Sequence, residues 1–217
     1  MKRITALRRG RGRGKRMNIF LDGRFAYSLG AELTVKEDLR IGQELPDDYI
    51  ETLEKSDRFQ RCFDSALRYL SYRPRSESEI REKLRRHGGG NECVAEVITR
   101  LKEQGLVDDI AFARFWKDNR ETFNPRSQQL TRLELRQKGV DSGIINQVIT
   151  EDDDTDNAYR SALSKIRHWP PSDYQSFRRR LGEYLRRRGF NYEVINSTVA
   201  RLWQERENRQ GEDSTLY

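Results

Sequence analysis

The sequence predicts a mainly α-helical protein of tandem three-helix repeats in an elongated, curved array, with a small N-terminal β-hairpin or three-stranded segment. Three observations support this fold class. Glycines recur about 50 residues apart, apolar residues recur at fixed distances from them, and β-rich stretches are confined to the N-terminus. Charged and hydrophobic residues are equally common, at 35% each, so we expect thin amphipathic helices with solvated outer faces.

The first 46 residues have the composition of short strands. β-branched, aromatic and aliphatic residues gather in residues 4–7, 17–21 and 24–29. Asp22-Gly23 lies between the second and third stretches and predicts a type I′ hairpin turn, which needs positive φ at both central residues. The sheet should end near Gly42, and Asp47 or Asp48 should cap the helix that follows.

Residues 8–16, RRGRGRGKR, join the first two expected strands and carry six cations spaced by glycines. One interpretation is a contact for a polyanion, and the other is a solvated loop whose charge aids solubility. A run of charged residues is compatible with both interpretations. The candidate binding residues in and beside this loop are Arg9, Arg11, Arg13, Lys15 and Arg16.

The stretch from 74 to 109 is the template of the repeat. Ser76 and Glu79 have the spacing of a capping box, in which each side chain satisfies a backbone N–H at a helix start. Gly88 follows twelve residues after Ser76 and should end that helix. The next helix has one apolar face, made of Cys93, Val94, Val97, Ile98 and Leu101.

The template returns twice. Gly139 lies 51 residues after Gly88, and Gly189 lies 50 beyond that. Ser127 precedes Gly139 by twelve residues, as Ser76 precedes Gly88. Apolar residues keep their distances from each glycine, as shown by Leu84, Leu135 and Leu185 before it and by Ile98, Ile149 and Val199 after it. Hydrophobic staples are expected at Val107 with Phe112, Val140 with Ile145 and Phe190 with Ile195.

The third copy differs because Ser172 lies seventeen residues before Gly189, which predicts a longer helix with a capping box from Ser172 and Gln175. We therefore expect five parts along the chain. They are a β-rich segment with the basic loop (1–46), a first repeat with a leading helix (47–107), a second (108–153) and a third (154–206) three-helix repeat, and a disordered tail (207–217).

Few residues have the pattern of a catalytic or metal site. His87 and His168, the only histidines, lie beside expected helix ends. Asp108-Asp109 fits a helix cap better than a metal-binding pair, and residues 151–154 have the composition of a linker with a cap. Cys62 and Cys93 fall among apolar helix positions, which favours buried free thiols. We expect no enzyme activity, no cofactor and no metal.

The charge of the chain favours an acidic partner. Lys and Arg number 42 against 35 Asp and Glu, for a net charge of +7, and nucleic acid is the commonest acidic partner of such proteins. No apolar run approaches the roughly 20 residues that span a bilayer, and the basic N-terminus lacks the apolar segment of a secretory signal. We expect a cytoplasmic protein that does not bind membranes.

The strongest candidate surface lies in residues 177–189, FRRRLGEYLRRRG. A helix here would bury Phe177, Leu181, Tyr184 and Leu185 and turn Arg178, Arg179, Arg180, Arg186 and Arg187 outward. Only Glu183 opposes them within the helix, which favours a polyanion or an acidic partner over a merely solvated face. Arg126 and Arg132, with Arg136 and Lys138, predict a weaker basic surface on the second repeat.

Four segments of the chain resemble the RecX family of regulatory proteins of the RecA recombinase. They are YLSYRPRSESEIREKL at 69–84, GLVDDIAFAR at 105–114, PRSQQLTRLELRQKGVD at 125–141 and RRRLGEYLRRRGFNYEVI at 178–195. The resemblance covers most of residues 60–205, while the β-rich segment is absent from the shorter family members. It implies three-helix repeats that lie in the groove of the RecA filament on DNA and inhibit recombinase and coprotease activity in DNA repair and the SOS response.

Two functions are compatible with these observations. The first is a non-catalytic modulator of the RecA filament, a monomer that contacts RecA with its repeats and single- or double-stranded DNA phosphates with its basic patches. The second is a free-standing nucleic-acid-binding helical protein that acts without a recombinase.

Overall fold

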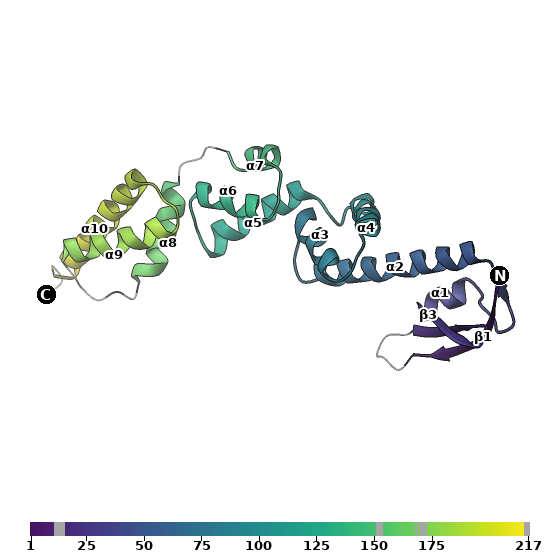
Figure 1. The fold of residues 1–217 in the computed structure, drawn as a ribbon. Helices are drawn as coiled ribbons and strands as arrows, with labels where there is room; N and C mark the ends of the chain where they lie inside the picture. The colour runs from purple at the N-terminus through teal and green to yellow at the C-terminus, as the bar shows by residue number, and fades with distance from the viewer. Residues whose placement is uncertain (11–15, 151–153, 168, 170–172, 215–217) are drawn as a thin grey trace. The chain divides into compact units, whose positions relative to one another are not determined.

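The computed structural model describes residues 1–10, 16–150, 154–167, 169 and 173–214 (Figure 1). The chain divides into two compact units, each of which is described by itself. One contains Met1–Arg73 and Ile80–Val107, and the other contains Pro74–Glu79 and Asp108–Tyr217. Each unit contains two separate hydrophobic clusters.

The first unit begins with a four-stranded antiparallel sheet in the order β3-β2-β1-β4. Its strands are β1 (Lys2–Arg9), β2 (Arg16–Leu21), β3 (Arg24–Gly30) and β4 (Glu44–Leu45). The three predicted strands are confirmed. The predicted turn is confirmed as well, since φ is 49° at Asp22 and 81° at Gly23. The two-residue strand β4 and the short helix α1 (Ala31–Lys36) were not anticipated because both are too short to show a period.

Helix α2 (Asp47–Leu70) joins the sheet to the helices of the first unit. Ile50 and Leu53 near its start lie in the cluster under the sheet, whereas Ala66 near its end lies in the cluster with the next two helices. The prediction that Asp47 or Asp48 caps this helix is wrong, because the N-cap position is Pro46. Both aspartates lie in the first turn instead, where a carboxylate interacts favourably with the helix dipole.

The helices α3 (Glu77–Arg86) and α4 (Asn91–Glu103) follow the predicted template. Glu79 N donates to Ser76 Oγ at 3.2 Å and Ser76 N donates to Glu79 Oε2 at 3.3 Å, which confirms the capping box. Gly88 has a φ of 81°, the left-handed conformation that ends helices and favours glycine. Cys62 and Cys93 are free thiols, half-buried in the same cluster.

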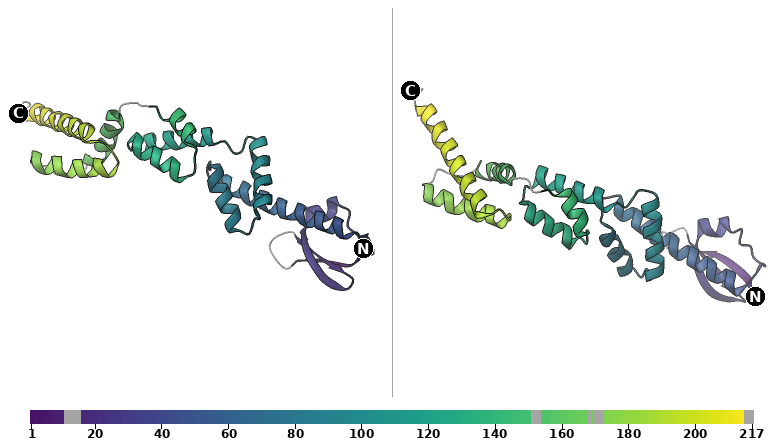
Figure 2. Two further views of the ribbon diagram at one scale, coloured as in Figure 1. Left: turned by 45° about the horizontal axis from the view of Figure 1, so that its top comes forward. Right: turned by 90° about the horizontal axis from the view of Figure 1, so that it is seen from above.

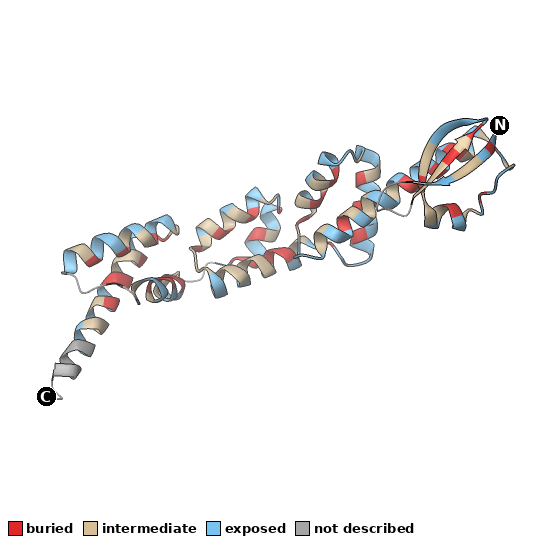
Figure 3. Ribbon diagram, turned by 90° about the horizontal axis from the view of Figure 1, so that it is seen from below, coloured by how far each residue is buried: buried red, intermediate tan, exposed pale blue. Residues whose placement is uncertain are grey.

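The second unit contains six more helices. They are α5 (Asp109–Phe123), α6 (Gln128–Gln137), α7 (Ser142–Val148), α8 (Thr155–Ile166), α9 (Tyr174–Arg187) and α10 (Tyr192–Ser214). Buried residues recur along one side of each long helix, as the amphipathic pattern predicts (Figure 3). One cluster joins α5, α6 and α7, and the other joins α8, α9 and α10. Helices α9 and α10 lie side by side in both views of Figure 2.

The repeat signals have the structural roles expected of them. Gly139 and Gly189 have φ values of 72° and 84°, as Gly88 does. Asp108, Asp141 and Asn191 each cap a helix start by accepting a hydrogen bond from a backbone N–H. Five of the six expected staple residues are buried, namely Val107, Phe112, Val140, Ile145 and Phe190.

Helix ends from neighbouring copies of the template meet inside the second unit. Ser76 Oγ donates to the carbonyl of Lys138 at 2.6 Å, and Ser127 N donates to the carbonyl of Arg188 at 3.0 Å. In both cases a serine at one helix start meets a carbonyl that lies 62 or 61 positions later, directly before the glycine that ends another helix. These contacts use carbonyls that a helix end otherwise leaves without a partner.

The same helix starts are capped a second time by acidic residues. Asp109 Oδ1 accepts from Glu77 N at 2.8 Å, and Asp154 Oδ1 accepts from Gln128 N at 3.0 Å. The sequence suggested that Asp109 and Asp154 cap the helices in which they lie. Their carboxylates instead bond the helix start of the preceding copy.

The third copy departs from the prediction at both ends. Helix α9 has 14 residues against 10 for α3 and α6, which confirms a longer helix. Its N-cap is Asp173, whose Oδ1 accepts from Ser176 N at 3.0 Å, so the predicted capping box of Ser172 and Gln175 is wrong. Ser172 itself lies outside the described residues. Helix α10 continues to Ser214, beyond residue 206, where we expected the last helix to end.

Candidate nucleic-acid interface

The helix α9 presents the basic face that its sequence predicts. Phe177, Leu181 and Leu185 are buried in the cluster with α8 and α10. Burial of this apolar stripe orients the helix and leaves the opposite side in solvent. The five predicted arginines of α9 are all exposed, and they are Arg178, Arg179, Arg180, Arg186 and Arg187.

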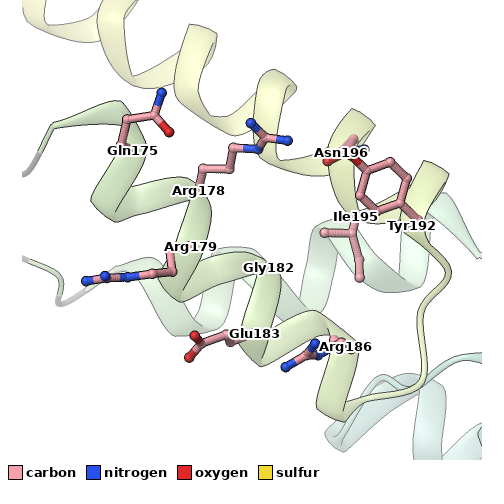
Figure 4. A pocket seen from close by; sticks show the side chains of 9 residues that line it. All are labelled: Gln175, Arg178, Arg179, Gly182, Glu183, Arg186, Tyr192, Ile195 and Asn196. Atoms are coloured by element: carbon pink, nitrogen blue, oxygen red, sulfur yellow. The ribbon is translucent and has the colours of Figure 1, made fainter.

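Three of these arginines line a groove of about 400 Å³ between α9 and α10 (Figure 4). They are Arg178, Arg179 and Arg186. The groove is completed by Gln175, Gly182 and Glu183 from α9 and by Tyr192, Ile195 and Asn196 from α10. The structure therefore gathers these cations around a concave surface rather than spreading them over a convex helix.

The groove carries an excess of positive charge. Three guanidiniums and one carboxylate, that of Glu183, line it. Among the residues that the structure describes, none of these five α9 arginines forms an ion pair with a carboxylate within 4 Å. Guanidinium groups bond phosphate oxygens two at a time, so this surface suits a phosphate-bearing ligand.

The other two arginines of α9 lie outside the groove. The guanidinium carbon of Arg180 lies 4.5 Å from the ring centroid of Trp169, a cation–π distance. Arg187 is exposed and is not among the groove residues. The predicted cluster of five arginines is thus divided into three groove residues, one that stacks on an aromatic ring and one on the open surface.

Tyr192 and Asn196 are groove residues that the sequence analysis missed. Tyr192 is 73% exposed at the start of α10. A hydrogen bond from Asn196 and the nearby charge of Arg178 lower the pKa of the Tyr192 hydroxyl below its usual value. The sequence signal for Tyr192 was an aromatic residue directly after Asn191, which caps the start of α10. The packing of α10 against the arginine-rich helix α9 is visible only in the structure.

Arg16, at the start of β2, is engaged inside the first unit. Its Nη2 lies 2.8 Å from Asp57 Oδ2, and its Nε donates to the hydroxyl of Ser28 at 3.1 Å. The Asp57 side chain is only 8% exposed and also accepts from Gly30 N at 2.7 Å. This ion pair ties the sheet to α2, and a guanidinium held in this way is poorly placed for an external phosphate.

Arg126 and Arg132 are also held by neighbouring groups. Arg126 bonds Glu134, whose other oxygen accepts from Arg120 Nε at 2.7 Å. Arg132 Nη1 donates to Asn146 Oδ1 at 2.8 Å, and its Nη2 bonds the carbonyl of Ile149. These two residues join α6 to its neighbours, so the weaker basic surface expected on the second repeat is partly neutralised.

The basic loop is described only at its edges. Arg9 ends β1 opposite Met17 and is exposed. Arg11, Arg13 and Lys15 lie outside the described residues.

The described residues contain no group of three or more His, Cys, Asp or Glu side chains placed to hold a metal ion. His87 lies beside the end of α3, where its Nδ1 is 2.9 Å from the carbonyl of Lys83. Among the same residues, no helix is both long and apolar enough to span a membrane.

Comparison with known proteins places the chain in a family. Residues 2–46 match the model described as the regulatory protein RecX N-terminal domain. Residues 62–101 match the first RecX three-helix domain, and residues 151–199 match the third. The chain belongs to the RecX family. The β-rich segment, which the sequence resemblance did not cover, is therefore part of the family architecture.

Relatives that match nearly all of this chain extend the assignment beyond the three matched segments. The regulatory protein RecX of Bacillus pumilus is 27% identical over 220 residues, covering 100% of this chain and 84% of the relative. The RecX protein of Bacillus subtilis is 29% identical, covering 93% and 78%. That of Clostridium beijerinckii is 27% identical, covering 93% and 96%. Their shared name supports a regulatory role for this RecX-family chain.

Solved RecX structures have the same fold. A crystal structure of a regulatory protein RecX superposes with a TM-score of 0.61 at 26% identity, covering 90% of this chain and 98% of that one. RecX from Lactobacillus salivarius gives a TM-score of 0.57 at 22% identity, covering 68% and 97%, a likeness that concerns the fold alone. The expected class of helical repeats with an N-terminal β segment is confirmed.

Proposed function

We propose that this protein is a non-catalytic regulator that binds the RecA–DNA filament and inhibits the recombinase and coprotease activities of RecA in DNA repair and the SOS response. The main support is the groove between α9 and α10, which offers Arg178, Arg179 and Arg186 to a phosphate-bearing ligand in a chain of the RecX family. A cytoplasmic location, where such filaments form, accompanies this proposal.

The proposal assigns different tasks to different surfaces. The groove and the exposed Arg187 and Arg9 meet DNA phosphates, because their guanidiniums are exposed. Arg16, Arg126 and Arg132 keep the fold intact, because their guanidiniums already bond groups of the protein. Contacts with RecA itself are assigned to the repeats, as the family resemblance implies.

Hydrolysis of ATP by RecA on DNA tests the proposal. The rate is measured with and without the protein, at a salt concentration that abolishes the protein's own binding to DNA but leaves RecA active. Inhibition that persists supports a direct contact with the filament. RecA alone at each salt concentration is the control.

A second candidate function is a free-standing nucleic-acid-binding protein, favoured by the same exposed arginines. In that case the protein only competes with RecA for DNA. Inhibition would then disappear together with the protein's DNA binding as salt rises, because phosphate contacts weaken with counterion concentration. Loss of inhibition under those conditions would overturn the filament proposal.

A further inference from the structure

The groove has one feature that a general basic surface does not need, a glycine in the middle of its main helix. Arg178, Arg179, Gly182 and Arg186 follow one another at spacings of one, three and four, so they share one face of α9. Glycine inside a helix is less favourable than alanine, because it loses more backbone freedom on folding. Gly182 therefore needs a reason within the structure.

Packing does not supply that reason. A Cβ atom at Gly182 would lie 3.7 Å from Ile195 Cγ2, which is an ordinary van der Waals contact. An alanine would fit without displacing α10. The absence of a side chain instead keeps the floor of the groove open beneath the three arginines. An open floor lets a ligand approach the helix more closely than a side chain would allow.

The α10 wall of the groove supplies an aromatic surface. Tyr192 is 73% exposed, although an aromatic ring gains free energy by burial. Asn196, one turn further along α10, lies beside the ring, and Arg178 extends toward it from α9 (Figure 4). They help to hold the ring at the groove while leaving much of it in solvent.

These two walls match the two parts of a nucleotide. Arginines that track a backbone and an aromatic ring on which a base stacks are the recurring elements of single-strand binding. A duplex cannot use the ring in this way, since its bases are stacked on one another. We propose that the groove binds single-stranded DNA, with phosphates at Arg178, Arg179 and Arg186 over Gly182 and one base stacked on Tyr192. This inference rests on the proposed function and names the ligand of the same site.

The test separates base stacking from phosphate binding. Fluorescence anisotropy is measured with a labelled thymidine oligonucleotide and with an abasic oligonucleotide of equal length, which has the same phosphates but no bases. We expect the wild-type protein to bind the thymidine strand on the order of tenfold more tightly, the effect of one stacked base. Tyr192→Ala should remove this preference, and Tyr192→Phe should keep it because the ring remains.

Arg186→Ala serves as the matched control. It removes a phosphate contact, so it should weaken binding of both oligonucleotides by a similar factor and leave their ratio unchanged. The inference is overturned if the wild type binds the two strands equally, or if Tyr192→Ala retains the preference. Because Tyr192 is exposed, Tyr192→Ala is expected to fold, and its circular dichroism spectrum checks this.

Failure of this inference can be told apart from failure of the proposed function. Wild-type protein that inhibits RecA ATP hydrolysis but has no base preference retains the function and loses the assignment of the groove. Wild-type protein that prefers the thymidine strand but fails to inhibit RecA retains the groove and loses the function.

Discussion

The hydroxyl of Ser76 donates a hydrogen bond of 2.6 Å to the backbone carbonyl of Lys138, although the residues are 62 positions apart. The same oxygen accepts a bond of 3.2 Å from Glu79 N. A serine hydroxyl can donate and accept at once, so one fully buried side chain starts a helix and joins that start to the end of another.

Ser76→Ala should therefore destabilise the protein by about 1–3 kcal/mol, through the lost cap and the unpaired buried groups it leaves. Chemical denaturation measures this change. The control is Ser142→Ala, since Ser142 is exposed at the start of α7 and its loss should change stability by less than about 0.5 kcal/mol. Equal effects of the two substitutions would contradict the assigned role of Ser76.

Asp57→Asn should destabilise the protein by about 2 kcal/mol, because the half-buried Arg16 loses its counter-charge. Thermal or chemical denaturation measures the loss. Arg61 is the second cation near Asp57, at 3.4 Å, but its side chain is 61% exposed. Arg61→Ala is thus the matched control and should cost less than about 1 kcal/mol. If both variants were equally destabilised, the pair with Arg16 would not be the important one.

The arginines should divide into two groups when DNA binding is measured against salt. Arg178→Ala and Arg179→Ala should each reduce the slope of log affinity against log salt by about 0.7 on single strands. Arg126→Ala should leave the slope unchanged and lower stability instead, because that guanidinium bonds Glu134. A slope that falls with Arg126→Ala but not with the α9 variants would reverse the assignment.

Gly182→Ala should raise stability by about 0.5–1 kcal/mol, since alanine favours the helix and its Cβ meets no close contact. It should also weaken binding of a thymidine oligonucleotide, because the added methyl group occupies the groove floor. Thr99→Ala, an exposed change on α4, is the control. It should favour its helix slightly and leave DNA binding unchanged. Unaltered binding by Gly182→Ala would mean that the ligand does not reach the floor.

Cys93 should react slowly with alkylating reagents. Burial, together with a hydrogen bond to Cys62, raises the pKa of its thiol from 9.0 to about 11. At pH 8 the folded protein should hold about 100-fold less thiolate at Cys93 than an ordinary thiol. Iodoacetamide labelling followed by mass spectrometry, compared with the denatured protein, measures this.

The same pKa shift has a consequence for stability. A pKa raised by folding contributes stability that is present below pH 9 and is lost as pH rises toward about 11. Stability should thus decline across this range less steeply in Cys93→Ala than in the wild type. Rapid labelling of native Cys93 at pH 8 would contradict both expectations.

The repeats could be predicted because their signals are local and recur. Gly88, Gly139 and Gly189 all adopt the left-handed conformation that ends a helix, and the apolar positions follow a 3.6-residue period. The two-residue strand β4 depends on pairing with Lys2 and Arg3, which are distant in sequence. No local pattern reveals such a strand.

The exposure of the candidate site residues was predicted in part, for a similar reason. The helical period of the apolar residues predicted that the five arginines of α9 face the solvent, and all five are exposed. Periodicity does not reveal which cations have partners. Arg16 meets Asp57 across 41 positions, and Tyr192 reaches the groove only because α10 packs beside α9. Separating structural arginines from available ones requires the tertiary structure.

The start of α9 differs from the two serine-capped starts in the hydrogen bonds that its capping side chain can form. Ser76 and Ser127 are buried, and their helix starts meet the closing carbonyls of a later helix. Asp173 is exposed, and the bond from Ser176 N lowers the pKa of its carboxyl, so it stays ionised. An ionised carboxylate has no proton to donate and repels the negative end of a helix dipole. The side-chain hydrogen bond that Ser76 Oγ makes to the Lys138 carbonyl therefore has no counterpart that Asp173 can form, because only a hydroxyl both accepts from its own helix start and donates to another helix end.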